Sequence, residues 1–212
     1  METWAIVVAA GGGARFGGPK QFAPLGGSTV IDRAVATARE SCDGVVVVLA
    51  AGATWDPPAG VRTAIGGATR SASVRAGLAC VPETADVVLV HDAARPLASR
   101  RLFATVIDAI AGGADAAVPG LLVVDTLKRV DDHHVVETVS REGLVAVQTP
   151  QAFRAEALRA AHAGNGNDTD DAALVEAGGG KVVVVDGERR NLKLTGADDL
   201  ELARTLLEGL QP

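Results

Sequence analysis

The stretch that decides the fold is Trp4-Ala5-Ile6-Val7-Val8-Ala9-Ala10, which runs directly into the glycine-rich segment 11–18. A continuous apolar run of this length is typical of a strand buried on both faces, as in a parallel sheet. Glycines after such a strand let the backbone turn sharply and present its N–H groups to an anion. The start of the chain therefore predicts a first β-strand that leads into a phosphate-binding loop.

Strand-like and helix-like segments alternate along most of the remaining chain. Apolar residues at helical spacing follow Ser28-Thr29, a pair expected to cap a helix. Further strands are expected at 45–49, 61–65, 86–90, 115–118 and 181–186, and further helices after Ser71 and Ser73, after Ser99, over 154–163, from Thr169 and from Ala197. This alternation predicts an α/β fold with a doubly wound, mostly parallel sheet of the Rossmann-like kind. Because ligands of such sheets bind at the carboxyl ends of strands, we expect the site in the loops after Ala10, Ile65, Val90 and Val118.

The segment 121–147 interrupts this alternation. Two β-rich runs, 123–130 and 135–139, flank Asp131-Asp132-His133-His134, a pattern typical of a β-hairpin. Such an insertion has no place inside the sheet, so we expect either a lid or an arm that reaches a partner subunit. The rest of the chain is expected to complete one domain over 1–212, since α/β units often reach this size.

The composition excludes several classes of protein. The formal net charge is −6 and aromatic residues make up 3% of the chain, which argues against a general nucleic-acid or membrane-surface binder. No apolar run approaches the ~18 residues of a transmembrane helix. Two cysteines, Cys42 and Cys80, cannot form a disulfide framework. We therefore expect a cytoplasmic protein with neither nucleic acid nor membrane as a partner.

The glycine-rich loop reads AAGGGARFGGPKQ over 9–21. It lacks the spacing of a Walker A loop because Pro19 precedes Lys20, and it lacks the dinucleotide fingerprint because Phe16 stands at the third glycine position. What remains is a glycine loop with two cations, Arg15 and Lys20. Two such cations suit a triphosphate with charge developing at its α-phosphorus. The residues alone leave open a plain turn with two solvated basic side chains.

Several segments, taken in order along the chain, resemble one family. The glycine loop with its PKQ resembles the signature loop of nucleotidyltransferases that act on sugar or polyol phosphates. The segments GGATRSASV (66–74) and VHDAARP (90–96) resemble those of the 2-C-methyl-D-erythritol 4-phosphate cytidylyltransferase family. The same order continues with Asp125-Thr126 and Lys128, QTPQ (148–151), Thr169-Asp170 and Asn191-Leu192-Lys193. Ala68 departs from the family pattern at a position that is often acidic.

The resemblance implies transfer of a cytidylyl group from CTP to a polyol phosphate, in a single nucleotidyltransferase domain of the isoprenoid pathway. The implied catalytic residues are Arg15, Lys20 and Lys193. The implied nucleotide-binding residues are Ala9, Ala10, Gly11, Gly13, Gly66, Gly67, Ser73, Asp92 and Ala93. The implied acceptor-binding residues are Arg95, Thr126, Arg141, Thr149, Thr169 and Lys193.

Asp92 is also the expected ligand of Mg²⁺, because a carboxylate at a strand end can hold this ion against phosphate oxygens. Considered as bare residues, Asp92 and Ser73 are equally suited to capping a turn or a helix. His91 is expected to pack or to form hydrogen bonds, and the pair His133-His134 to lie at the polar hairpin tip without a metal.

In the family the hairpin crosses to a second subunit, so the resemblance implies a homodimer with a shared acceptor pocket. Two alternatives stay open. A ribitol 5-phosphate cytidylyltransferase would use the same fold and chemistry with a longer acceptor. A non-catalytic nucleotide-binding regulatory module would need no acceptor site, and the joint presence of Arg15, Lys20, Asp92 and Lys193 argues against it.

Overall fold

The computed structural model describes residues 1–13, 16–164 and 170–209. Its larger strands are β1 (Thr3–Ala9), β4 (Gly44–Leu49), β5 (Val61–Ile65), β6 (Val87–Asp92), β7 (Ala116–Leu122) and β12 (Val182–Asp186). Shorter strands are β2 (Pro24–Leu25), β3 (Ser28–Thr29), β10 (Val145–Val147) and β11 (Gln151–Arg154), and the hairpin is formed by β8 (Leu127–Asp131) and β9 (His134–Val139). The helices are α1 (Val30–Ser41), α2 (Arg70–Leu78), α3 (Arg100–Ala111), α4 (Ala155–His162), α5 (Asp171–Ala177) and α6 (Ala197–Glu208), with a 3-10 turn at Lys20–Phe22.

The main sheet has the strand order β10-β7-β11-β6-β1-β4-β5, and β12 pairs with β7. The pairs β1–β4, β1–β6, β4–β5 and β7–β12 are parallel, whereas β10 and β11 run antiparallel to their neighbours. The predicted doubly wound, mostly parallel sheet is therefore confirmed. The sequence reading missed both antiparallel strands, because three or four residues give too short a pattern to recognise.

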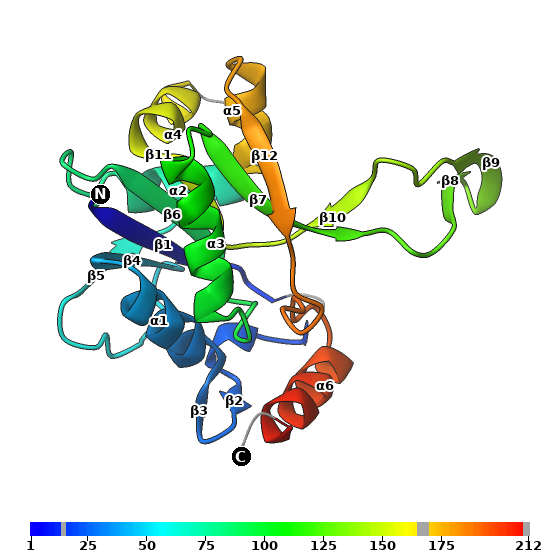
Figure 1. Ribbon diagram of the computed structural model, residues 1–212. Coiled ribbons are helices and arrows are strands. Elements are labelled where there is room, and N and C mark those ends of the chain that lie inside the picture. Colours follow the sequence, from blue (N-terminus) through cyan, green and yellow to red (C-terminus); the bar gives the residue numbers. More distant parts are fainter. Residues whose placement is uncertain (14–15, 165–169, 210–212) are drawn as a thin grey trace.

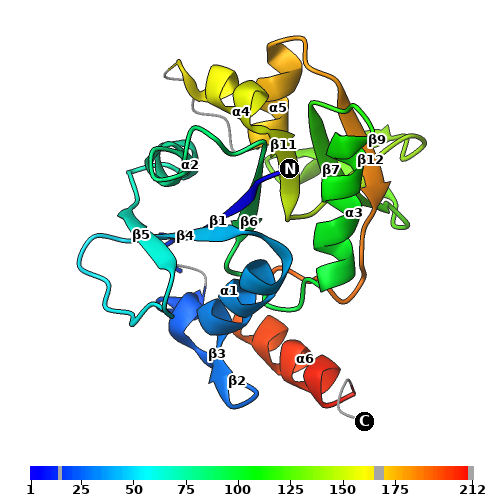
Figure 2. The same ribbon diagram turned by 60° about the vertical axis from the view of Figure 1, so that its left-hand side comes forward.

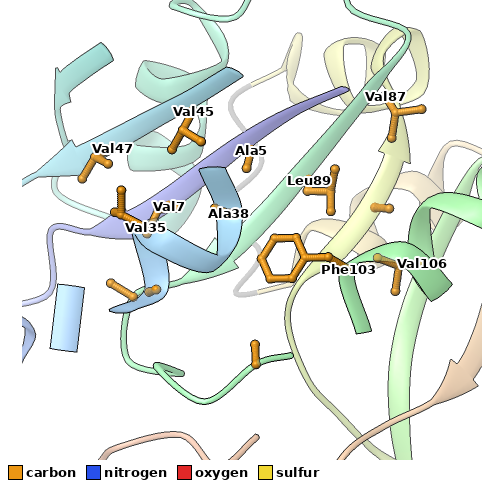
Figure 3. Close-up of a cluster of buried hydrophobic side chains, with 14 of the residues drawn as sticks. Ala5, Val7, Val35, Ala38, Val45, Val47, Val87, Leu89, Phe103 and Val106 are labelled. Atoms are coloured by element: carbon orange, nitrogen blue, oxygen red, sulfur yellow. The ribbon is translucent and has the colours of Figure 1, made fainter. Parts of the chain in front are cut away.

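Helices cover both faces of the sheet (Figure 2). The helices α1 and α3 pack on one face, where Val35 and Phe103 meet alternate residues of the central strands, such as Val7 and Val47 (Figure 3). The other residues of the same strands, such as Ile6, face α2, α4 and α5. Alternation of this kind explains why the central strands read as continuous apolar runs.

The segment predicted as a hairpin projects from the body of the molecule (Figure 1). Its strands β8 and β9 pair with each other antiparallel and form a sheet of their own. The hairpin carries apolar side chains that are not buried in this chain: Val130 is 54% exposed, Val135 60% and Val136 58%. We call the segment 123–144, between β7 and β10, the arm.

Three local expectations were wrong. The cap of α2 is Thr69, whose hydroxyl accepts from the amide of Ala72, so Ser71 and Ser73 lie inside the helix rather than before it. The strand β7 continues to Leu122, so no loop follows Val118. The strand β6 continues to Asp92, so the loop expected after Val90 begins only after Asp92, which ends the strand as expected.

Other expectations agree with the structure. The hydroxyls of Thr29 and Ser99 cap α1 and α3 as predicted. The helix expected from Thr169 begins at Asp171, and Thr169 itself lies outside the described residues. No helix in the described part of the chain has both the length and the apolar composition needed to cross a membrane.

Candidate functional site

A cavity of about 390 Å³ opens where β1 and β6 end and α2 begins. We call it the first cavity; it lies at the carboxyl edge of the parallel strands, where ligands of this fold class bind. Among the described residues, Asp92 is the one carboxylate in its wall. The lining consists of Val8, Ala9, Ala10, Gly11, Gly12, Lys20, Gln21, Gly67, Ala68, Thr69, Arg70, Ser73, Asp92, Ala93, Ala94 and Lys193.

The glycines after β1 fall into two kinds. Gly11 and Gly12 line the first cavity, and a Cβ on either would meet no protein atom within 4 Å, so it would only occupy space at the cavity wall. Gly13 has a φ of +65°, and a Cβ there would lie 1.8 Å from the carbonyl oxygen of Gly18. The carbonyl of Gly13 also accepts from the amide of Phe16 at 2.8 Å. Gly13 is therefore required by the turn itself, and it is not among the described residues that line the cavity.

The glycines after β5 allow α2 to approach β1. A Cβ on Gly66 would lie 2.5 Å from the Cβ of Ala10 and 2.8 Å from the Oγ of Ser73. The Ser73 hydroxyl accepts from the amide of Gly67 at 3.2 Å and donates to the carbonyl of Thr69 at 3.0 Å. Ser73 therefore fixes the loop that forms this wall, and it does not cap the helix, which was the alternative left open for the bare residue.

Two lysines from opposite ends of the chain meet at the first cavity. The Nζ of Lys20 donates to the carbonyl of Leu194 at 2.6 Å, and the neighbouring Lys193 places its Nζ 2.6 Å from the Oδ2 of Asp92. The segment around Leu194 is held in place because the Leu194 amide donates a hydrogen bond to the carbonyl of Ala94 and the Leu194 side chain is buried. The 3-10 turn after the glycine-rich loop and the C-terminal segment thus supply one cation each to the same space.

The carboxylate of Asp92 is ionised over the whole neutral range. Burial alone would raise its pKa, but Arg70 and Lys193 outweigh burial and lower the pKa to about 2. The Oδ1 atom lies 3.5 Å from the Nε of Arg70. The backbone amide of Asp92 donates to the hydroxyl of Thr149 at 3.0 Å. A fixed negative charge thus lies between two cations at the edge of the cavity.

His91 is fully buried and has structural partners. Its Nδ1 lies 3.2 Å from the Thr149 hydroxyl, its Nε2 lies 3.2 Å from the carbonyl of Arg95, and its ring meets Phe103 edge to face. Since a carbonyl can only accept, Nε2 carries the proton and Nδ1 accepts from Thr149. Burial lowers the pKa of His91 to about 4, so the ring is neutral at pH 7. The expectation of a packing histidine is confirmed.

A second cavity of about 280 Å³ adjoins the first. Its wall is made mainly of polar and charged side chains from β6, the turn before β11, the start of α5 and the C-terminal segment. The two cavities share Arg70, Asp92 and Lys193. The lining of the second cavity consists of Arg70, Asp92, Arg95, Val147, Gln148, Thr149, Gln151, Asp170 and Lys193.

Hydrogen bonds hold the far wall of the second cavity in place. Arg95 donates to the carbonyls of Asn191, at 2.8 Å, and of Val147, at 3.4 Å. Asn191 donates to the carbonyl of Thr149 at 2.9 Å, and the Gln148 side chain links the same segments. The predicted acceptor residues Arg95, Thr149 and Lys193 are thus brought together.

The other predicted site residues fall into two groups. Thr126 and Arg141 belong to the arm and are not among the described residues that line either cavity, and Arg141 donates to the carbonyl of Val124. Arg15 and Thr169 lie outside the described residues.

Sequence reasoning missed residues that the structure brings to the site. Arg70 stands in both cavity walls, and Gln148, Gln151 and Asp170 line the second cavity. Each lies within a motif that resembles the family, so the motif was the available signal. Within the described ranges, no group of three or more histidine, cysteine, aspartate or glutamate side chains could hold a metal ion by itself.

Comparison with known proteins places this geometry in a family. The family model for 2-C-methyl-D-erythritol 4-phosphate cytidylyltransferase matches residues 3–209. The enzyme of that name from Nocardia farcinica is 45% identical, over 96% of this chain and 93% of its own length. The corresponding Rhodococcus jostii enzyme is 46% identical over 96% of this chain and 94% of its own length.

A solved structure and a longer relative complete the comparison. The crystal structure of 2-C-methyl-D-erythritol 4-phosphate cytidylyltransferase from Thermus thermophilus matches with a TM-score of 0.87 at 40% identity, covering 98% of this chain and 100% of that one. The bifunctional enzyme IspD/IspF of Solidesulfovibrio magneticus is 43% identical over 94% of this chain, which spans only 56% of that protein. The chain belongs to the 2-C-methyl-D-erythritol 4-phosphate cytidylyltransferase family.

Proposed function

We propose that the chain transfers CMP from CTP to 2-C-methyl-D-erythritol 4-phosphate and releases pyrophosphate. The observation that carries this proposal is the meeting of two cavities at Asp92 and Lys193. A transferase must hold two substrates with their reacting atoms adjacent, and adjoining cavities with a common charged wall meet that need. The first cavity would hold CTP and the second the polyol phosphate, so Ala9, Ala10, Gly11, Gly67 and Ala93 would contact the nucleotide.

The transfer reaction requires that the two substrates be positioned and that the developing charge be stabilised, and it does not require a general base. A phosphate monoester has its second pKa at about 6, so its oxygen is already anionic at neutral pH. This oxygen attacks the α-phosphorus of CTP, the bond from that phosphorus to the β-phosphate bridging oxygen breaks, and the electron pair leaves with pyrophosphate. Lys20 and Arg15 would stabilise the charge on the triphosphate, and Lys193 would hold the incoming phosphate beside it.

Mg²⁺ fits this site as a companion of the triphosphate. The ion is commonly bound by one or two carboxylates together with substrate phosphates. The ionised Asp92 is the one carboxylate that the described residues bring to the first cavity, so it would supply the protein ligand. When bound, the ion would neutralise charge on the phosphate oxygens.

We further propose a cytoplasmic homodimer joined through the arm. The exposed valines of the arm need cover, and Thr126 and Arg141 are not among the described residues that line either cavity of their own chain. A partner's arm over the second cavity would bring its Thr126 and Arg141 to the acceptor. The composition and the two unpaired cysteines, Cys42 and Cys80, suit the cytoplasm.

The test is pyrophosphate release by the purified protein with CTP and Mg²⁺. Methylerythritol 4-phosphate and ribitol 5-phosphate are supplied in parallel reactions, and we expect turnover with the first. Turnover mainly with ribitol 5-phosphate would retain the chemistry and change the substrate. Tight CTP binding without turnover on either acceptor would instead support a regulatory nucleotide-binding module.

A further inference from the structure

Two buried ionisable side chains lie behind the site. Asp171, at the start of α5, and His162, at the end of α4, have side chains 0% and 1% exposed. Neither is among the described residues that line the two cavities. Buried carboxylates are costly unless they are paired and hydrogen-bonded, so this pair requires an explanation.

Asp171 has a different partner on each oxygen. Its Oδ1 lies 2.9 Å from the Nε2 of His162, and its Oδ2 lies 2.5 Å from the Nη1 of Arg70. Arg70 is the first residue of α2, and its Nε faces the Oδ1 of Asp92 at 3.5 Å. A chain of contacts therefore runs His162–Asp171–Arg70–Asp92 and ends at the boundary between the cavities.

The histidine in this chain acts as a hydrogen-bond donor. A carboxylate only accepts, so the Nε2 of His162 must carry a proton. Among the described residues, its Nδ1 is buried without a hydrogen-bond partner. The imidazole thus fixes the rotation of the Asp171 carboxylate.

Arg70 is the side chain on which this fixed carboxylate acts. Burial opposes its charge, but Asp171 and Asp92 outweigh burial and raise its pKa, so it stays cationic. Its long side chain could otherwise turn wholly toward Asp92 as a bidentate partner and compete with Lys193, which lies 2.6 Å from that carboxylate. Asp171 holds one end of the guanidinium away from Asp92.

We propose that His162 and Asp171 are positioning residues, which hold Arg70 across the boundary of the two cavities and so keep Asp92 and Lys193 in the arrangement that transfer requires. The inference rests on the proposed function and deepens it. It assigns a role to side chains that are remote from either substrate, and it explains why a buried carboxylate–imidazole pair is built beneath α2.

The test compares three substitutions on one helix, each assayed at a temperature at which it is fully folded. His162→Leu removes the donor, and we expect kcat to fall by about tenfold, because small misplacements of charged groups are costly in such sites. His162→Gln retains an N–H donor and should recover activity to within about threefold of wild type. Leu158→Ala removes buried volume from the same helix face but none of the four side chains in the chain of contacts, and its kcat should match wild type.

A readout independent of turnover accompanies the assay. In the substrate-free protein, the guanidinium N–H resonances of Arg70 should be protected from exchange and should shift in His162→Leu and in Asp171→Asn. CTP binding measured without acceptor should change less than about threefold in His162→Leu, because most of the wall of the first cavity, apart from Arg70 and Asp92, takes no part in the chain of contacts.

The outcomes separate this inference from the function on which it rests. A tenfold loss in His162→Leu, rescued in His162→Gln and absent in Leu158→Ala, would support the positioning role. If the wild-type protein is active and His162→Leu has the same kcat and the same Arg70 resonances as wild type, the inference is overturned and the proposed function is not. A wild-type protein without turnover on either acceptor would overturn the proposed function and this inference with it.

Discussion

The two cavities are built in different ways. The wall of the first is largely backbone and small side chains, contributed by the loop after β1, the loop before α2 and the end of β6. The wall of the second is made of long polar side chains, whose positions depend on hydrogen bonds among four segments. A wall made of backbone leaves space for a ligand because no long side chain projects from it. A wall made of long side chains keeps its shape only when further side chains hold them in place. The two should therefore respond differently to substitution.

The largest effect is expected at Lys20, a cation in the wall of the first cavity only. Lys20→Ala should lower kcat by about 10²–10³, the usual cost of losing one preorganised charge at a reacting group. Steady-state pyrophosphate release measures this, and circular dichroism checks the fold. Lys181→Ala is the control, since Lys181 is exposed and precedes β12, far from the carboxyl edge of the sheet. Near wild-type turnover in Lys20→Ala would refute the assignment.

A smaller effect, on the KM for CTP, is expected at Gly66, behind the backbone wall. The added methyl of Gly66→Ala would come within 3 Å of Ala10 and Ser73, so the loop must move away from β1. We expect the KM for CTP to rise about tenfold with the KM for the acceptor unchanged, because overpacking shifts the wall it touches. Gly164→Ala, where a Cβ would meet nothing within 4 Å, should leave both constants as they are. Equal changes in both KM values would remove the distinction between the cavities.

Mixed dimers test whether the second cavity is completed by a partner's arm. Lys20→Ala damages the body of a subunit, and Thr126→Ala damages its arm. If sites are shared, random mixing leaves about a quarter of sites with both parts intact, so activity should recover to about a quarter of wild type. Each variant alone should stay near its own low activity. Absence of recovery in dimers verified as mixed would mean that each chain completes its own second cavity.

The difference between the cavities also explains what could be read from the sequence. The parallel sheet and the first cavity depend on contiguous segments, since an apolar run, a glycine loop and a strand end define them locally. The second cavity depends on Gln148, Gln151 and Asp170, whose contacts arise only after β11 inserts between β6 and β7. A four-residue antiparallel strand gives almost no periodic signal, so these neighbours could not be deduced from spacing.

Arg70 and Asp171 illustrate the same limit at a single contact. They stand 101 positions apart and meet at 2.5 Å. Nothing in the residues around Asp171 distinguishes it from a helix-start carboxylate, which is a common surface feature. The valines of the arm show that burial, too, could not be predicted from the sequence. They resemble those of β4, yet Val135 is 60% exposed whereas Val46 is fully buried. Hydrophobicity predicts a strand but not whether the rest of the chain buries it.

The smallest expected effect is a change of stability with pH, and it concerns two buried side chains, Asp92 in the walls of both cavities and His91 beside it. Asp92 has a pKa of about 2 in the folded protein against an ordinary value of 3.8, so its stabilisation is present above about pH 4 and is lost as the pH falls toward 2. His91 has a folded pKa of about 4 against 6.5, so stability should already decline between about pH 6.5 and 4, as the unfolded chain takes up a proton that the buried ring does not.

Urea unfolding at pH 7.5, 5 and 3 measures the free energy of unfolding across both pH intervals. His91→Asn should flatten the upper interval and Asp92→Asn should weaken the lower one, where Asp32, Asp43 and Asp199, whose pKa values are also lowered, keep part of the slope. If His91→Asn left the decline between pH 7.5 and 5 unchanged, the ring would not be held neutral by burial, and the donor assigned to Thr149 would have to be reversed.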